Sequence, residues 1–467
     1  MKIQFCGAAR TVTGSSHLLI LEDGYKILLD CGLFQGQDAY DDENNLKFLF
    51  RPEEIDCLVL SHAHIDHAGR IPKLVKEGFR GRIICTSATK DLSEIMLADS
   101  AHIQEKDTQY ENKKRKKRGL GLVNPLYSVE DAQHSLKQFV SIKYEEWYQI
   151  KQGVEVLFRD NGHILGSGSV SIKIKEGDRL IKVGFTGDIG RPNRPILKDP
   201  KQMDDVDVLL CESTYGGRIH EAFPDDLDHF YKVIKETCID RRGKIIIPAF
   251  SIGRTQEIVY MLDKLHHEKN LDRIPVYVDS PLSTNATEIY RNHTECFDEE
   301  ISAHLQSDPN PFGFNNLQYI TEVEESKNLN MMEGPAIIIS ASGMAEAGRV
   351  IHHISNNIEN ENNTILMVGY CAKGTLGARI RNGEKEIKLF GEMKQVKARV
   401  ELMDSFSAHG DQKEMLDFLD NLDRKSLQKI YLVHGDYEEG QMPFKKCLED
   451  KGFEKVLIPE KGEIHVV

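Results

Sequence analysis

Short apolar runs alternate with amphipathic segments along the whole chain, and this alternation is typical of a layered α/β fold. Runs of four to six residues, rich in Ile, Val and Leu, predict strands. The predicted strands cover residues 26–29, 57–60, 180–185, 206–211, 244–248, 275–278, 336–339, 364–368 and 430–433. The first seven residues, Met-Lys-Ile-Gln-Phe-Cys-Gly, lack the apolar core of a signal peptide and predict an opening strand.

Two amphipathic segments predict helices. Residues 255–267 place Ile258, Val259, Leu262 and Leu265 on one face. Residues 411–422 place Met415, Phe418, Leu419 and Leu422 in helical phase. The second segment begins with Asp411 and Glu414, whose spacing predicts a capping box at its first turn.

Several of the apolar runs are each followed by a chemically active side chain. These residues are Asp30, His62, Asp188, Glu212 and His434. In layered α/β proteins, binding sites gather beyond the carboxyl ends of strands. A single Asp or His in such a place is more often a cap or turn residue, but five of them predict one shared site.

The most specific motif is H-x-H-x-D-H over residues 62–67, which places three imidazoles and one carboxylate within six residues. Imidazole nitrogens and carboxylate oxygens are zinc ligands. A structural explanation is poor, because the same groups buried without a metal would be left unsatisfied. We expect His62 and His64 to share one ion, while Asp66 and His67, at the start of the next helix, face a second.

Further ligands must come from elsewhere in the chain. His163 lies in the glycine-flanked segment Asn-Gly-His-Ile-Leu-Gly-Ser, and Asp188 lies in Thr-Gly-Asp. We predict that the first zinc takes His62, His64, His163 and Asp188, and that the second takes Asp66, His67, Asp188 and His434. Asp30 is expected to accept a hydrogen bond from a ligand histidine and so to fix its orientation.

Length, charge and cysteine content limit the possible classes of protein. A chain of 467 residues suggests two or three domains at roughly 100–200 residues each. The net charge of −14 argues against a protein that coats nucleic acid. Residues 113–118 are six consecutive basic residues, which we interpret as a loop that is either simply solvated or in contact with phosphates.

The nine cysteines contain no C-x-x-C pair, so neither a disulfide framework nor a cysteine zinc site is expected. Several of them lie inside apolar runs and are expected in the core. We therefore expect a cytoplasmic protein. No run approaches the roughly 18 apolar residues of a membrane span, so no membrane partner is expected.

The motifs together resemble the metallo-β-lactamase superfamily, which shares H-x-H-x-D-H, a G-H-x-x-G-S histidine and T-G-D. Glu212, His409 and His434 look like motifs A, B and C of its β-CASP branch. Residues 248–254, 340–344 and 369–377 also resemble β-CASP segments. The chain is most similar to bacterial and archaeal relatives of the pre-mRNA 3′-end cleavage nuclease.

The resemblance implies an α/β fold in which an αββα sandwich carries an inserted β-CASP domain. The expected boundaries are residues 1–212 and 396–467 for the sandwich, and residues 213–395 for the inserted domain. It also implies a ribonuclease with two zinc ions and an RNA substrate, and a possible homodimer. A histidine at motif C, here His434, looks like the RNA-processing branch rather than the DNA-repair branch.

In the expected reaction, Asp66 orients the attacking water and accepts its proton, and His409, held by Glu212, protonates the leaving oxygen. Arg254, Ser342 and Ser407 are weaker candidates for contacts with substrate phosphates. The alternatives are a DNA nuclease, a small-molecule metallo-hydrolase on the same core, and a non-catalytic RNA-binding subunit. The sequence leaves open whether cleavage is endonucleolytic or also 5′–3′ exonucleolytic.

Overall fold

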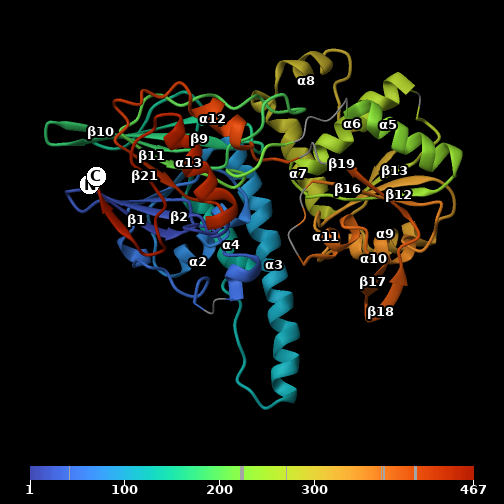
Figure 1. Cartoon of the computed structure of the whole chain (residues 1–467). Helices are drawn as coiled ribbons and strands as arrows, with labels where there is room; N and C mark the ends of the chain where they lie inside the picture. Colours follow the sequence, from blue (N-terminus) through green and yellow to red (C-terminus); the bar gives the residue numbers. More distant parts are fainter. Residues whose placement is uncertain (41–42, 221–225, 270, 370, 372–373, 404–406) are drawn as a thin grey trace. The chain divides into compact units, whose positions relative to one another are not determined.

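The computed structural model describes residues 1–40, 43–220, 226–269, 271–369, 371, 374–403 and 407–467. These residues divide into two compact units (Figure 1). The first unit joins Met1–Ile219 with His409–Val467, and the second is His220–Ala408. The units change over after residues 219 and 408, whereas the sequence predicts domain boundaries after residues 212 and 395. These domain boundaries remain predictions.

The first unit contains two seven-stranded sheets. One has the order β22-β1-β2-β3-β4-β5-β6, and the other has the order β21-β20-β11-β10-β9-β8-β7. The first sheet consists of β1 (Lys2–Gly7), β2 (Ser16–Ile20), β3 (Lys26–Leu29), β4 (Cys57–Val59), β5 (Arg82–Thr86), β6 (Phe139–Ile142) and β22 (Ile464–Val466). The second consists of β7 (Tyr148–Lys151), β8 (Val154–Asp160), β9 (Gly168–Glu176), β10 (Arg179–Phe185), β11 (Val208–Cys211), β20 (Lys429–Leu432) and β21 (Val456–Leu457).

The two sheets pack face to face. Ile27 and Leu29 of β3 belong to the same buried cluster as Val208 and Leu210 of β11. The intervening Leu28 belongs to a different cluster, on the outer face of the first sheet. Side chains alternate between the two faces of a strand. A strand such as β3 therefore contributes both to the core between the sheets and to the core under the outer helices.

Helices cover the two outer faces and complete an αββα sandwich, which confirms the expected fold class. The first sheet is covered by α1 (Ile65–Ala68), α2 (Ile71–Lys76), α3 (Ser87–Lys117) and α4 (Val129–Ser135). The second is covered by α12 (Gln412–Leu419) and α13 (Met442–Asp450). Asp411 caps α12, and the predicted capping box with Glu414 is present.

The second unit is built on a six-stranded parallel sheet of order β14-β13-β15-β12-β16-β19. Its strands are β12 (Lys244–Pro248), β13 (Val276–Asp279), β14 (Leu317–Tyr319), β15 (Ala336–Ser340), β16 (Thr364–Val368) and β19 (Arg399–Met403), beside the small pair β17 (Glu386–Leu389) and β18 (Glu392–Gln395). Its helices are α5 (Asp226–Ile234), α6 (Arg254–Lys269), α7 (Pro281–Asn292), α8 (Glu299–His304), α9 (Val323–Met331), α10 (Val350–Asn357) and α11 (Leu376–Arg381). Strands β12, β15 and β16 are buried along their whole length, as expected of a parallel sheet covered on both faces.

The predicted strands agree with β3, β12 and β16 and otherwise differ by one or two residues at an end. The loop predicted over residues 113–118 is wrong, because α3 continues to Lys117 and Arg118 is its C-cap. The nine cysteines, all among the described residues, form no disulfide, and eight of them are buried. None of the described helices combines the length and apolar character needed to cross a membrane.

Candidate metal centre

The predicted ligands lie at strand ends of both sheets in the first unit. The segment after β4 carries His62 and His64, and α1 carries Asp66 and His67. The loop after β3 packs tightly against this segment, since a Cβ atom on Gly32 would lie 1.6 Å from the backbone oxygen of Asp66. The backbone N–H of Cys31 donates to the carbonyl of His67 at 2.7 Å. The ligand segment is therefore held by backbone contacts and has a fixed path.

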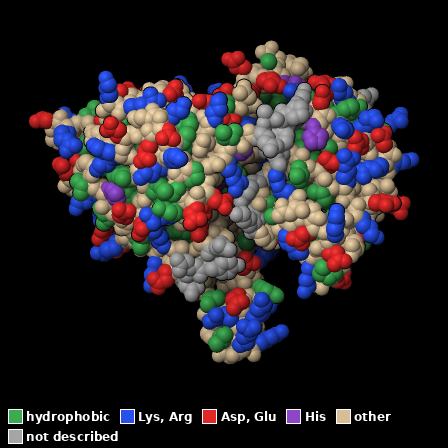
Figure 2. Space-filling model, in the orientation of Figure 1, with side chains coloured by type: hydrophobic (Ala, Val, Ile, Leu, Met, Phe, Trp, Pro, Cys, Tyr) green, Lys and Arg blue, Asp and Glu red, His purple; other side chains and the backbone are tan. Residues whose placement is uncertain are grey.

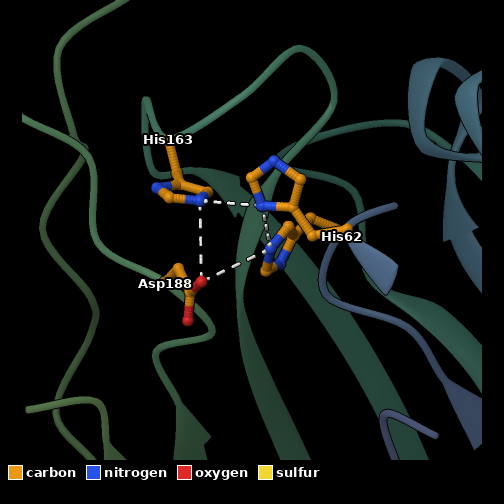
Figure 3. A group of neighbouring side chains, drawn as sticks. His62, His163 and Asp188 are labelled. Carbon is orange, nitrogen blue, oxygen red and sulfur yellow. Dashed lines mark hydrogen bonds and ion pairs between the residues drawn. The ribbon is translucent and has the colours of Figure 1, made fainter. Parts of the chain in front are cut away.

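Four side chains converge on one point in the first group, formed by His62, His64, His163 and Asp188. Nδ1 of His64 lies 3.2 Å from Nε2 of His62 and 3.1 Å from Nε2 of His163. Oδ2 of Asp188 lies 3.5 Å from each of the same two Nε2 atoms. Figure 3 shows His62, His163 and Asp188 pointing toward one another.

The second group consists of Asp66, His67 and His434, and Asp188 of the first group also reaches it. Nε2 of His67 lies 3.1 Å from Nε2 of His434 and 3.2 Å from Oδ2 of Asp188. Oδ2 of Asp66 lies 3.5 Å from Nε2 of His434. The structure thus brings all seven predicted ligand side chains into two adjoining groups.

These separations fit a tetrahedral metal ion. Zinc bonds to nitrogen and oxygen at about 2.0–2.2 Å, so two ligand atoms of a tetrahedral site lie about 3.3–3.6 Å apart. The observed separations of 3.1–3.5 Å between ligand atoms are close to that edge length. In addition, Oδ1 of Asp188 is buried and accepts no hydrogen bond from the described residues, and Nδ1 of His434 lies 3.4 Å from it. A buried carboxylate oxygen without a hydrogen bond is costly, and a cation would satisfy it.

The protonation states of the histidines in the first group also suit metal binding, whereas in the second group burial of His67 is outweighed by Asp188 and Asp30, which hold the pKa of His67 well above its usual range. Burial lowers the pKa of His62, His163 and His64, the last to about 4. These three rings are therefore neutral at pH 7 and present the lone pairs that a metal needs. Burial opposes ionisation of Asp188, but the surrounding histidines outweigh it and hold the pKa of Asp188 well below its usual range.

A network of hydroxyl and carboxyl groups orients the ligand rings. Oδ2 of Asp30 lies 2.6 Å from Nδ1 of His67, so the remaining Nε2 atom of His67 faces the second group. Oγ of Ser61 lies 3.0 Å from Nδ1 of His62, and Oγ1 of Thr214 lies 3.0 Å from Nδ1 of His434. Such partners fix the tautomer and the ring plane of a ligand.

Sequence reasoning singled out Asp30 but missed Ser61 and Thr214. Each is adjacent to, or two residues from, a residue that the motifs did identify. The sequence contained one indication, because Ser61 precedes His62 and Thr214 lies two residues after Glu212. No sequence motif, however, marks a hydroxyl that orients a ligand.

The backbone is strained at two of these positions. Asp30 has φ of 57° and His434 has φ of 48°, a left-handed region that non-glycine residues rarely occupy. Such a conformation costs of order 1–3 kcal/mol and persists only where the surroundings impose it. Asp30 directly follows β3 and His434 lies two residues after β20, so this backbone conformation turns their side chains toward the metal groups.

His409 and Glu212 form a pair beside the two groups. Nδ1 of His409 lies 3.3 Å from Oε1 of Glu212 and 4.0 Å from Oδ2 of Asp188. Glu212 is fully buried and also accepts from the backbone N–H of Ile189 at 2.5 Å. Burial disfavours the charged imidazolium, but the carboxylates of Glu212 and Asp188 outweigh it and raise the pKa of His409 to about 9. His409 is therefore a proton donor at neutral pH.

The three predicted substrate contacts lie in the second unit. Arg254 is the first residue of α6, where it is buried and forms an ion pair with Glu257. Ser342 follows β15 and donates to the carbonyl of Ala347 at 3.3 Å. Ser407 is buried, and it is the second-last residue of the second unit in the sequence. Arg254 is thus buried and already paired with a carboxylate. The contacts of Arg254, Ser342 and Ser407 with substrate phosphates remain predictions.

Three family models match consecutive parts of the chain. The model described as "Metallo-beta-lactamase superfamily" matches residues 10–227, and that of the "Beta-Casp domain" matches residues 255–380. The model described as "Zn-dependent metallo-hydrolase RNA specificity domain" matches residues 393–459. The last match includes the segment from β19 to β21, which carries His409 and His434.

Several characterised proteins are similar over nearly the whole chain. The chain is 35% identical to "Ribonuclease TTHA0252" of Thermus thermophilus, over 99% of each chain. It is 32% identical to "Transcription termination factor FttA" of Methanococcus maripaludis, over 93% of this chain and 67% of that protein. It is 29% identical to "Cleavage and polyadenylation specificity factor 73" of Drosophila melanogaster, over 94% of this chain and 60% of that protein.

A solved structure titled "Crystal Structure of a Protein of Unknown Function from Enterococcus faecalis V583" has the same fold. It matches with a TM-score of 0.54 and 12% identity, over 100% of this chain and 99% of that chain. Three family models matched in order, and a relative 35% identical along the whole chain, show that this protein belongs to the β-CASP family of the metallo-β-lactamase superfamily.

Proposed function

We propose that this protein is a zinc-dependent ribonuclease that hydrolyses RNA phosphodiester bonds. The observation that carries the proposal is the arrangement of two ligand groups around the shared Asp188, with the His409–Glu212 pair beside them. Relatives named as a ribonuclease and as a cleavage factor support RNA as the substrate. The match to an RNA specificity domain supports it too.

Membership of the superfamily implies divalent metal ions, and we propose that they are two zinc ions. His62, His64, His163 and Asp188 would hold the first, and Asp66, His67, Asp188 and His434 would hold the second. When bound, such ions neutralise charge on phosphate oxygens and lower the pKa of a water to near neutrality. A histidine-rich set of this kind favours zinc over magnesium, calcium or manganese.

The remaining steps belong to side chains of this chain. Asp66, with about a fifth of its side chain exposed, orients the attacking water and accepts its proton. His409 donates a proton to the leaving ribose oxygen, and Glu212 holds its Nδ1 side. Donation would then occur from Nε2. Acid–base assistance of this kind typically contributes about 10²–10⁴-fold to the rate.

The alternatives differ in features that this chain possesses. A simple small-molecule hydrolase on the same core needs neither an inserted β-CASP domain nor the His409–Glu212 pair. A DNA nuclease of the family would be expected to lack the motif C histidine, which is His434 here. A non-catalytic subunit would be expected to lose ligands, whereas all seven candidate ligands are present.

The test uses end-labelled RNA and single-stranded DNA of one sequence, with zinc added. We compare the natural protein with His409→Ala and with His134→Ala, which removes an exposed histidine of α4. Cleavage of RNA alone, abolished only by His409→Ala, is the expected result. Internal fragments indicate endonuclease action, and mononucleotides indicate 5′–3′ exonuclease action. Equal cleavage of DNA would contradict the proposed substrate.

We also propose that the protein acts in the cytoplasm and forms a homodimer. The eight buried thiols, none in a disulfide, suit a reducing compartment. The homodimer rests on family resemblance, and light scattering of the purified protein at several concentrations tests it. A mass of one chain, 53.1 kDa, at all concentrations would contradict it.

A further inference from the structure

The basic run singled out in the sequence lies at the end of a projecting arm. Helix α3 buries side chains only as far as Ala101, although it continues to Lys117. The chain returns in an extended segment and is buried again at Tyr127. We call residues 102–126 the α3 arm. Figure 1 shows it extending away from the strands of the first unit.

The arm is held in shape by its own contacts. The side chain of Asn112 donates to the carbonyl of Val123 at 2.8 Å and accepts from its N–H at 2.9 Å. Nε of Arg115 donates to the carbonyl of Gly121 at 2.5 Å. At the base, Oγ of Ser100 and the hydroxyl of Tyr127 lie 2.9 Å apart. The arm therefore presents its tip on an ordered support.

The tip concentrates positive charge that the chain does not neutralise. Residues 113–118 are Lys-Lys-Arg-Lys-Lys-Arg, and five of the six are exposed. Figure 2 shows Lys and Arg side chains gathered on this arm. None of the six forms an ion pair with another described residue, whereas many lysines and arginines elsewhere do. The whole chain carries a net charge of −14, so this tip is a local exception.

Helix stability alone does not account for six charges. Cations in the last turn of a helix stabilise it by about 0.3–1 kcal/mol each through the helix dipole. Lys114, Arg115, Lys116 and Lys117 lie in the last turn and gain from the dipole, but like charges three or four positions apart repel one another. An anionic partner would relieve this repulsion.

The other end of the same helix lies against the metal centre. The hydroxyls of Thr86 and Thr89 donate to the carbonyl of Gly166 at 2.6 Å and 2.8 Å, and Gly166 belongs to the loop that carries His163. Thr89 and Arg115 are 26 positions apart on one helix. At 1.5 Å per residue, the tip lies about 39 Å from this loop.

We propose that the α3 arm is an auxiliary RNA-binding site, where Lys113, Lys114, Lys116 and Lys117 hold the phosphate backbone of a strand whose cleaved bond lies at the metal centre. The inference rests on the proposed ribonuclease function. Five consecutive helical residues, Lys113 to Lys117, point to all sides of the helix, which suits a flexible polyanion better than a flat protein surface. The exposed ring of Tyr110, beneath Lys114, offers a face on which a base can stack.

The spacing predicts how long an RNA must be to use the arm. A stacked strand advances about 3.4 Å per nucleotide, so about a dozen nucleotides span the distance from the metal centre to the tip. An RNA of about 8 nucleotides at the metal centre would not reach the arm, whereas one of about 24 nucleotides would.

The test measures binding of fluorescent 8-mer and 24-mer RNAs by anisotropy, in full-length protein carrying His409→Ala to prevent cleavage. One variant adds K113A, K114A, K116A and K117A, which preserve helix propensity. The control adds K2A, K425A, K446A and K451A, four exposed lysines of the same unit. We expect the 24-mer to bind the arm variant about tenfold more weakly, with a salt slope smaller by about 2.8, and the control variant as before.

Three results would overturn the proposal. These are equal 24-mer affinities in the arm and control variants, an equal loss for the 8-mer and the 24-mer, and an unchanged salt slope. If the arm variant bound the 24-mer as tightly as the control variant, the alternative partner of the arm would be an acidic protein surface. Binding is measured without cleavage, so its outcome is separate from the activity test. A protein that cleaves RNA while its arm variant binds like the control keeps the ribonuclease function and loses this inference.

Discussion

Oδ2 of Asp30 lies 2.6 Å from Nδ1 of His67, and the same carboxylate also joins the segments that follow β3 and β4. Asp30 accepts from the backbone N–H of Ser61 at 2.8 Å and from its hydroxyl at 2.9 Å. The hydroxyl of Ser15 donates to it at 3.1 Å. One buried carboxylate therefore orients a candidate ligand and fixes the path of the segment that carries two others.

Replacing Asp30 tests this orienting role. Asp30→Asn keeps the shape of the side chain but removes the charge that favours a proton on Nδ1 of His67. We expect zinc affinity to fall about 10–100-fold, as is usual when a ligand histidine loses its carboxylate partner. Competition with a chromogenic chelator measures the change. Asp178→Asn, at an exposed position, is the control. Equal affinities for the two variants would contradict the role.

The shared ligand makes a prediction about metal count. Oδ2 of Asp188 lies 3.5 Å from Nε2 of His62 in the first group and 3.2 Å from Nε2 of His67 in the second, whereas His434 belongs to the second. We expect two zinc ions per chain in the natural protein, one in His434→Ala and fewer than one in Asp188→Ala. Elemental analysis after gel filtration measures them. Two ions retained in His434→Ala would contradict the assignment of that histidine, and one ion in the natural protein would contradict the two-zinc proposal.

The sequence was most informative where chemistry and strand ends coincide. His62, Asp188 and His434 could be singled out because each follows a buried apolar run, and the motif at residues 62–67 is local. The geometry that joins them could not be predicted, because it depends on contacts such as that between Nε2 of His67 and Nε2 of His434, 367 positions apart. The strands that were predicted lie within two residues of the observed ones, because burial patterns are local, whereas others, such as β5, β8 and β9, were not predicted.

The arm shows where local reasoning fails. Six basic residues looked like a loop because no apolar periodicity accompanies them. Lys and Arg are nevertheless good helix formers, and α3 is already established by its buried first half, so the helix continues without burying more side chains. Ser61 and Thr214 were missed for a different reason, because a hydroxyl gains its role only from the ring that folding places beside it.

The pair of Glu212 and His409 predicts a change in the pH dependence of cleavage. A general acid must be protonated to act, and the pKa of His409 is about 9 because the carboxylates of Glu212 and Asp188 outweigh burial. Glu212→Gln removes one of these charges and lowers that pKa, so the alkaline decline of kcat should move to lower pH. Profiles of kcat against pH for the two proteins measure the shift. Coincident alkaline limbs would contradict His409 as the acid.

Asp160, at the end of β8, predicts a change in stability with pH. Burial raises the pKa of Asp160 to about 7, although the backbone N–H of Gly162 partly opposes this. The unfolded chain has a pKa of about 3.9 at this residue. Between about pH 4 and pH 7 the native state therefore holds a proton that the unfolded state releases, and stability falls as pH rises.

Asp160→Asn removes this titration and keeps an oxygen that can accept from Gly162. We expect the variant to be more stable than the natural protein at neutral pH, by about 1 kcal/mol because the side chain is partly exposed to water. The difference should shrink as pH falls and disappear below about pH 3, where Asp160 is protonated in both states. Urea unfolding midpoints across this range measure it, with Asp178→Asn as the exposed control. A constant difference at every pH would show that Asp160 does not titrate in the native protein as proposed, because only a group with unequal pKa values in the two states makes stability depend on pH.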